Sequence, residues 1–204
     1  MKRVLAYSFF CLIALSTLAQ DWNAREIDTA RGEDYLSESE KEVILLVNKV
    51  RTMPALFARK YVESRRGESA AAEECYNELL KWPAQKPLKP SRALSLSSRD
   101  HAEDMGKTGA IGHVSTNGKT STQRVQRYGV FKGAYTGPWE NCSYGFDDPL
   151  EIILQLLIDD DVPSRGHRKN IMESQVNFMG TSIRPHKTYS YNCVMDFADA
   201  IADK

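Results

Sequence analysis

The strongest constraint on the fold is a pair of strand-forming runs near the end of the chain. The segment NFMGTSIRPHKTYSYNCVMDFA, residues 177–198, has two runs with the alternating pattern of β-strands, joined by the turn-like RPHKTY. Its second half places large side chains on one face: Tyr189, Tyr191, Cys193, Met195 and Phe197. We therefore expect a β-hairpin here, with one face turned toward a core. A shorter strand is predicted upstream, at PWENCSYG, residues 138–145.

Helix-forming runs lie before and between these strands. In residues 36–53, Ser37 and Glu40 have the spacing of a capping box, and apolar side chains then recur at helical spacing. Pro54 suits the first turn of a second helical segment. Further helical patterns cover residues 70–82, 91–106, 121–129 and 147–161. This order of elements predicts an α+β fold in which helices cover a sheet.

The 204 residues suit one domain preceded by a targeting segment. Residues 1–19 have the layout of a secretory signal peptide, with two basic residues, an apolar run and small residues before the expected cut after Ala19. We expect a polar segment at 20–35 and one domain at 36–202. Within that domain, residues 63–90 are an elaboration that ends in a proline-rich connector.

The expected signal peptide indicates export, and its removal sets the net charge of the mature chain, which bears on possible partners. Cleavage removes two of the 27 basic residues and no acid, which leaves 25 basic against 27 acidic residues. A nearly neutral chain has no broad basic surface, so we expect no nucleic-acid partner. The apolar run is too short for a membrane span, and we expect none in the mature protein, which is then secreted or periplasmic.

Export exposes the cysteines of the mature chain to an oxidising compartment. Cys142 and Cys193 both sit in strand-like runs, so we expect a disulfide between them. Cys75 lies in a helical run and is expected to be a small buried side chain without chemistry.

The chain has four histidines, and His167 has the most unusual surroundings. In VPSRGHRKNIM, residues 162–172, a proline and a glycine set up a tight turn, and Ser164 is placed to cap a short helix. We expect a neutral His167 ring near the helix start, with Arg168 and Lys169 pointing to solvent and the next two residues securing the turn.

The other three histidines divide by context. His113 follows a glycine in a long irregular loop, where a functional role is favoured. His101 falls on the inward face of a helix that we expect Gly106 to end, and it fits a core histidine better than a site residue. His186 lies in the hairpin turn and is expected to be exposed. No standard catalytic motif is present, so any chemistry must come from residues far apart in the sequence.

The order of separated motifs resembles one known family. LVNKVR, SRDHAEDMG, IGHVST, WENCSYG, SRGHRKNIM and CVMDFA follow one another as the matching elements do in bacterial CAP-domain proteins, also called SCP/TAPS or PR-1-like proteins. The resemblance covers about residues 36–198. It implies an α-β-α sandwich, in which helices cover both faces of a central antiparallel sheet.

The resemblance also implies a site. Members of the family have a central cavity lined by two histidines and two acids, which in some of them holds a divalent metal, often zinc. The matching positions here are His113, Glu140 and His167, with Trp139 where a glycine is usual, a change expected to crowd the cavity. The motif that carries the second acid is missing. Asp160 is the nearest candidate, and the alternatives are Asp159, Asp161, or a site of only three residues.

Two functions follow from this set of residues. The first is a secreted binding or interaction module, whose ligand is a lipid, a peptide or a surface glycan and whose cavity is able to hold zinc or another divalent metal. The alternative is a metal-assisted peptidase or esterase, in which His113 and His167 hold the ion and Glu140 is the general base. In either case a buried Glu140 needs a cation or several donors, because burying it unpaired costs several kcal/mol.

Overall fold

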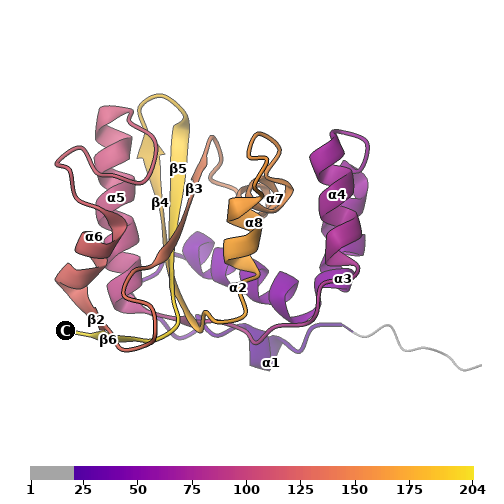
Figure 1. The fold of residues 1–204 in the computed structure, drawn as a ribbon, viewed down its shortest axis with the longest axis horizontal. Coiled ribbons are helices and arrows are strands. Elements are labelled where there is room, and N and C mark those ends of the chain that lie inside the picture. The colour runs from indigo at the N-terminus through magenta and orange to yellow at the C-terminus, as the bar shows by residue number, and fades with distance from the viewer. Residues whose placement is uncertain (1–20) are drawn as a thin grey trace, which may run out of the picture.

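The fold is described from a computed structural model, which covers residues 21–204 (Figure 1). The signal peptide expected at residues 1–19 therefore lies outside the described residues. The helical elements are α1 Ala24–Ile27, α2 Glu38–Thr52, α3 Pro54–Phe57, η1 Ala58–Val62, η2 Glu63–Arg65, α4 Ala70–Leu79, α5 Arg92–Thr108, α6 Ser121–Tyr128, α7 Pro149–Ile158 and α8 Gly166–Ile171. The strands are β1 Lys89–Pro90, β2 Gly129–Phe131, β3 Trp139–Tyr144, β4 Phe178–His186, β5 Ser190–Ala198 and β6 Ile201–Asp203.

The predicted hairpin forms the centre of the main sheet. Its four strands have the order β1-β4-β5-β3, and β3 is an edge strand. β4, β5 and β3 are antiparallel, whereas the two-residue β1 runs parallel to β4. β2 and β6 form a separate antiparallel pair. The sheet is therefore mainly antiparallel, as expected.

Helices cover both faces of this sheet, so the fold is the α+β sandwich that the sequence predicts. Figure 1 shows the sheet nearly edge-on, with α5 and α6 on one side and α2, α7 and α8 on the other. The larger core lies on the α2 and α7 side and includes Cys193, Met195 and Phe197 of β5. Val194 points to the other face, where it packs with Ala102 of α5. α4 lies outside the second helical layer (Figure 1).

The helix starts follow the local sequence closely. Ser37 and Glu40 form the predicted capping box of α2. Pro54 begins α3, and Pro149 begins α7 behind the capping carboxylate of Asp148. Ser37 and Asp148 accept hydrogen bonds from first-turn N–H groups, and a proline in the first turn has no N–H to satisfy, so these helix starts depend on the local sequence.

The end of α5 differs from the prediction. The helix continues through Gly106 to Thr108, and Gly109 ends it in the left-handed conformation (φ 80°). A Cβ atom at Gly106 would lie 2.2 Å from the carbonyl oxygen of Pro185. Gly106 is therefore explained by close packing of α5 against β4 and not by helix termination.

The predicted disulfide is wrong. Cys75, Cys142 and Cys193 are free thiols in residues 21–204. In the β3–β5 ladder Cys142 pairs with Val194, and Cys193 pairs with Ser143. The two cysteines are thus one residue out of register, and their side chains point to opposite faces of the sheet. Cys75 is buried as expected, and burial raises the pKa of its thiol to about 12.

Arg168 also contradicts its prediction. It was expected to point to solvent, but its side chain is fully buried between α7, α8 and α4. The guanidinium donates hydrogen bonds to the carbonyl oxygens of Leu157 and Ile158 and to the carboxylates of Glu74 and Glu78. This set of acceptors balances the cost of burying the charge, so Arg168 joins the three helices.

No helix in the described part of the chain combines the length and the apolar composition needed to span a bilayer.

Candidate functional site

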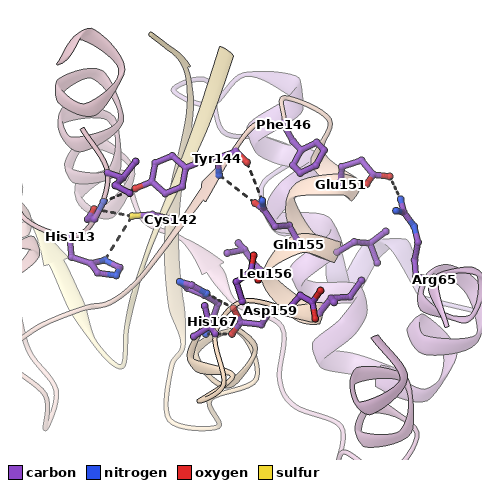
Figure 2. Close-up of a pocket in the computed structure, with 17 residues that line it drawn as sticks. Arg65, His113, Cys142, Tyr144, Phe146, Glu151, Gln155, Leu156, Asp159 and His167 are labelled. Carbon is purple, nitrogen blue, oxygen red and sulfur yellow. Dashed lines mark hydrogen bonds and ion pairs between the residues drawn. The ribbon is translucent and has the colours of Figure 1, made fainter. Parts of the chain in front are cut away.

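A cavity of about 720 Å³ opens between β3, the loop after α5 and the α7–α8 connection (Figure 2). His113 lies on one side of it and His167 on the other, although 54 residues of sequence separate them. Its apolar lining comes from Ile111, Tyr144, Phe146, Leu154, Leu156, Ile158 and Val162. A cavity of this size and lining is typical of small-molecule and peptide sites.

The first polar pair of the site joins His113 to Glu140. His113 Nδ1 lies 2.8 Å from Glu140 Oε1, and the imidazole is 56% exposed whereas the carboxylate is 4% exposed. Because a carboxylate accepts, Nδ1 carries the proton, and Nε2 remains free to bind a ligand. The hydrogen bond to Glu140 raises the pKa of His113.

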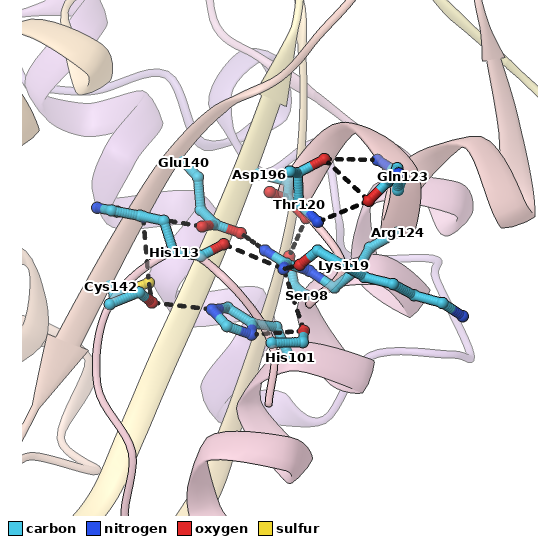
Figure 3. Close-up of polar contacts among 12 residues, drawn as sticks. Ser98, His101, His113, Lys119, Thr120, Gln123, Arg124, Glu140, Cys142 and Asp196 are labelled. Atoms are coloured by element: carbon cyan, nitrogen blue, oxygen red, sulfur yellow. Dashed lines mark hydrogen bonds and ion pairs between the residues drawn. The ribbon is translucent and has the colours of Figure 1, made fainter. Parts of the chain in front are cut away.

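Arg124 holds the other oxygen of Glu140 (Figure 3). This arginine of α6 is buried, and it also donates hydrogen bonds to the carbonyl oxygen of His113 and to Ser115 Oγ. Burial acts to raise the pKa of Glu140, but the His113 hydrogen bond and the Arg124 charge outweigh it and lower the pKa below its usual value. Glu140 is therefore a carboxylate with both oxygens occupied.

A second acid lies behind Glu140. Asp196 of β5 is directly opposite Glu140 in the β3–β5 ladder and is fully buried. Ser98 Oγ donates to its Oδ2 at 3.2 Å, whereas Oδ1 has no hydrogen-bond partner among the described residues. Burial, reinforced by the charge of Glu140, raises the pKa of Asp196 well above its usual value. Asp196 thus holds its proton more strongly than Glu140 does.

The second polar pair joins His167 to Asp159. His167 Nδ1 lies 2.7 Å from Asp159 Oδ1, and the backbone N–H of His167 donates to Oδ2 at 3.0 Å. Asp159 reaches this position because it ends α7 in the left-handed conformation (φ 57°). The carboxylate therefore fixes both the start of α8 and the ring of His167, whose Nε2 is left free.

Two details of the predicted His167 turn are wrong as a result. Arg165, in the left-handed conformation, precedes α8 without a side-chain cap, and Ser164 does not cap the helix. Asp159, and not Asp160, supplies the carboxylate that contacts His167. Asp160 and Asp161 are exposed residues on the rim of the cavity. Asn170 holds the turn as expected, through a 2.8 Å hydrogen bond to Asn141.

Trp139 does not crowd the cavity. Trp139 and Glu140 are consecutive residues of β3, so their side chains point to opposite faces. The ring of Trp139 instead packs against Tyr135, with ring centroids 4.7 Å apart, and it is not among the residues that line the cavity. Glu140 is also not a lining residue; it acts from behind His113.

His101, Glu140 and Cys142 form a set that could hold a metal ion. One potential ligand atom of each lies within 4.8 Å of the others, and no other such set of three occurs in residues 21–204. The set fits a metal poorly. His101 Nε2 donates to the carbonyl of Gly112 at 2.9 Å, and its Nδ1 accepts from Ser115 at 3.2 Å. Burial raises the pKa of the Cys142 thiol, which opposes the thiolate that a metal requires.

The two remaining histidine predictions have different outcomes. His101 is buried and faces inward, as expected. His186 was expected to be exposed but is only 3% exposed, because Nε2 donates to the carbonyl of Ala110 at 2.9 Å and Nδ1 accepts from the backbone N–H groups of Thr188 and Tyr189. His186 thereby ties the hairpin turn to the loop that carries His113.

Sequence reasoning missed Arg124 and Asp196 as site residues and named Asp159 only as an alternative to Asp160. Arg124 lies in a predicted amphipathic helix, and an arginine in such a helix is normally expected on the exposed face. The role of Asp159 depends on a left-handed backbone that three consecutive aspartates do not specify. Only Asp196 had a signal, since a charged residue in a core strand needs a reason to be there.

Comparison with known proteins places this geometry in context. The model of the CAP family, described as the cysteine-rich secretory protein family, matches residues 46–197. Among solved structures, an extracellular SCP-domain protein from Bacillus anthracis str. Ames is 18% identical (TM-score 0.49), with 78% of this chain and 40% of that chain covered. The chain thus spans well under half the length of that protein. An outer surface protein from Borrelia burgdorferi is 17% identical (TM-score 0.45), with 69% and 91% covered. No curated protein matches the chain.

Proposed function

The chain belongs to the CAP, or cysteine-rich secretory protein, family, and from that premise we propose that it is an exported binding module whose ligand enters the cavity between His113 and His167. One observation carries the proposal: two imidazoles from opposite sides line the same cavity, each held through Nδ1 by a buried carboxylate. Rings fixed in this way present their Nε2 atoms in a constant direction, which is the arrangement of a preorganised binding site. We place the mature protein outside the cell or in the periplasm.

The alternative of a metal-assisted hydrolase is less well supported. A general base must accept a proton from water, but both oxygens of Glu140 already accept hydrogen bonds from His113 and Arg124. The lowered pKa of Glu140 weakens it further as a base. No observation on the described residues favours hydrolysis over binding.

In this proposal a divalent metal such as zinc is held by the two imidazoles and not by the set of His101, Glu140 and Cys142. His113 and His167 have free Nε2 atoms, and Glu140 and Asp159 are placed to orient the rings from behind. When bound, the ion would supply a Lewis-acid anchor for the ligand. Glu140 and Asp159 fix the two imidazole rings, and the apolar lining of the cavity surrounds the ligand.

The ligand cavity can be tested with the neutral apolar dye Nile red. We expect the dye to bind the mature protein, because seven apolar or aromatic side chains line the cavity. Ile111→Glu should remove most of this binding, since Ile111 lines the cavity and is 59% exposed, so a charge there is tolerated by the fold. Val130→Glu is the matched control, because Val130 is 41% exposed on β2 and does not line the cavity. Equal dye binding by the two variants would place the binding surface elsewhere.

The metal proposal has a separate test. Zinc titration by calorimetry should detect binding to the mature protein and its loss in the double variant His113→Ala, His167→Ala, with the far-ultraviolet circular dichroism unchanged. Asp161→Asn, on the cavity rim, is the control that should retain zinc. Zinc affinity preserved in a folded double variant would show that these imidazoles are not the ligands.

A further inference from the structure

The free edge of β3 meets the cavity at Cys142. β3 has β5 on one side only. The N–H of Gly145 donates to the carbonyl of Tyr191 at 3.0 Å, toward β5, whereas the N–H and C=O of Tyr144 bond the side-chain amide of Gln155 at 3.3 and 3.0 Å. Because the backbone groups of successive residues in a strand point to alternate sides, Cys142 turns its N–H and C=O away from β5, as Tyr144 does.

Side chains cover this edge above and below Cys142 but not at Cys142 itself. Gln155 of α7 bonds the backbone of Tyr144, and Asn170 of α8 donates to the carbonyl of Glu140 at 3.4 Å. Within residues 21–204, the backbone N–H and C=O of Cys142 bond no other element. Cys142 is only 7% exposed and lines the cavity together with His113 and His167 (Figure 2).

Buried backbone groups are almost always paired, because an unpaired one costs as much as a lost hydrogen bond. A ligand that contacts the backbone of Cys142 from the cavity must therefore provide a hydrogen-bond acceptor for the N–H and a donor for the C=O. An extended peptide offers both at the correct spacing, as in the addition of a strand to a sheet edge. An alkyl chain offers neither.

We propose that the ligand of the cavity is an extended peptide that adds to the edge of β3, pairing its backbone with the N–H and C=O of Cys142 between the two imidazoles. The inference rests on the proposed binding function and names its ligand class. Pairing is limited to this one position, because Gln155 and Asn170 close the edge on either side.

The charges on the rim give the peptide a preferred composition. Asp159 is paired with His167, and Glu151 is paired with Arg65. Asp160 and Asp161 are exposed, and neither carboxylate forms an ion pair in the described part of the chain. Next to the apolar wall, these two charges favour a peptide in which basic side chains alternate with apolar ones.

The experiment measures binding of fluorescein-labelled decapeptides by fluorescence anisotropy. The probes are alternating valine and lysine, alternating valine and glutamate, and the valine–lysine peptide N-methylated at every residue, which removes its N–H donors. The protein variants are Cys142→Pro, which removes the backbone donor together with the thiol at an edge position where proline is tolerated, and Cys142→Ala, which removes the thiol and keeps the donor.

We expect the valine–lysine peptide to bind, the glutamate peptide to bind more weakly, and the N-methylated peptide to lose at least about tenfold in affinity. Cys142→Pro should lose a similar factor relative to Cys142→Ala, because both variants lack the thiol and only alanine keeps the N–H. If Cys142→Pro does not fold, the N-methylated peptide on the parent protein still decides the question.

Three results would overturn the inference. The N-methylated peptide could bind as well as the unmodified one, a folded Cys142→Pro variant could bind with parental affinity, or no peptide could bind at all. Nile red separates this failure from that of the proposed function. Dye bound without peptide refutes only the peptide inference, whereas absence of both refutes the binding cavity itself.

Discussion

At the scale of single residues, the site is organised by two neighbouring carboxyl groups whose pKa values shift in opposite directions. The pKa of Glu140, which faces His113 and Arg124, is lowered, whereas the pKa of Asp196, which lies directly across the ladder and has one hydroxyl donor, is raised. One cation cannot stabilise two adjacent charges in a buried space, so the acid with fewer donors retains its proton. Because Asp196 keeps its proton, Arg124 forms its ion pair with Glu140, and Glu140 in turn orients His113.

This arrangement predicts how stability depends on pH. The pKa of Asp196 is raised in the folded state, so as pH rises above about 3.8 the unfolded chain releases this proton and the folded chain keeps it. Asp196 therefore costs stability at neutral pH, and the cost disappears in acid. Asp196→Asn should raise the free energy of unfolding at pH 7 by about 1 kcal/mol or more, and should have little effect below about pH 3.8.

Urea unfolding followed by tryptophan fluorescence, at pH 7 and at pH 3.5, measures this difference. Asp161→Asn is the matched control, because its exposed carboxylate should change stability by less than about 0.5 kcal/mol. A loss of stability at pH 7 in Asp196→Asn would mean that Asp196 is ionised in the folded protein and paired with Arg124.

Residues were predicted well where the motif itself holds the geometry. His113 and Glu140 meet, and His167 begins a short helix, as the motifs indicate. The choice of Asp159 over Asp160 and the burial of Arg168 were not predicted, because they depend on a left-handed turn and on carboxylates from α4, more than 80 residues upstream. The sequence near Asp159 and Arg168 contains no signal for this turn or for these carboxylates.

At the scale of elements, α5 and β4 determine how the sheet meets its first helical layer. The contact is backbone to backbone at Gly180, where a Cβ atom would lie 2.1 Å from the nitrogen of Ser95 and 2.3 Å from the carbonyl carbon of Leu94. Such a short distance cannot be relieved by rotating a side chain. The close approach brings His101 and Ser98 of α5 to the polar cluster around Glu140 (Figure 3).

Gly180→Ala should therefore destabilise the protein by about 3 kcal/mol or more, because α5 must move away from the sheet. Gly32→Ala is the control, since nothing lies within 4 Å of an added Cβ there and alanine should be neutral or slightly stabilising. Thermal unfolding by calorimetry measures both. Equal melting temperatures for the two variants would contradict the close approach described here.

Periodicity and caps predicted the longer helices and strands but not the short α1, β1, β2 and β6, and tertiary contacts decided where some of the predicted elements end. The capping box of α2 and the proline start of α7 act within one helical turn, so the sequence alone was sufficient. Gly106 was misread because a glycine that ends a helix and a glycine that admits a neighbouring strand look the same in a sequence.

At the scale of the whole molecule, the cavity lies at the junction of the sheet with the second helical layer, and its two imidazoles belong to different sides of that junction (Figure 2). The sandwich was predictable from the order of motifs. The disulfide was not, because strand-like context for two cysteines says nothing about register, and a shift of one residue places their side chains on opposite faces.

Arg168 links that junction to the most peripheral part of the fold. α8, which carries His167, is fastened through one guanidinium to Glu74 and Glu78 of α4, within the segment that elaborates the domain. Substitution at these acidic positions would leave the buried guanidinium with backbone carbonyl acceptors and no counter-charge, so we expect changes there to accompany changes at position 168. Among related sequences, chains with a shortened or uncharged α4 should carry an uncharged residue in place of Arg168. An alignment of such sequences would show this covariation between position 168 and the two acidic positions of α4.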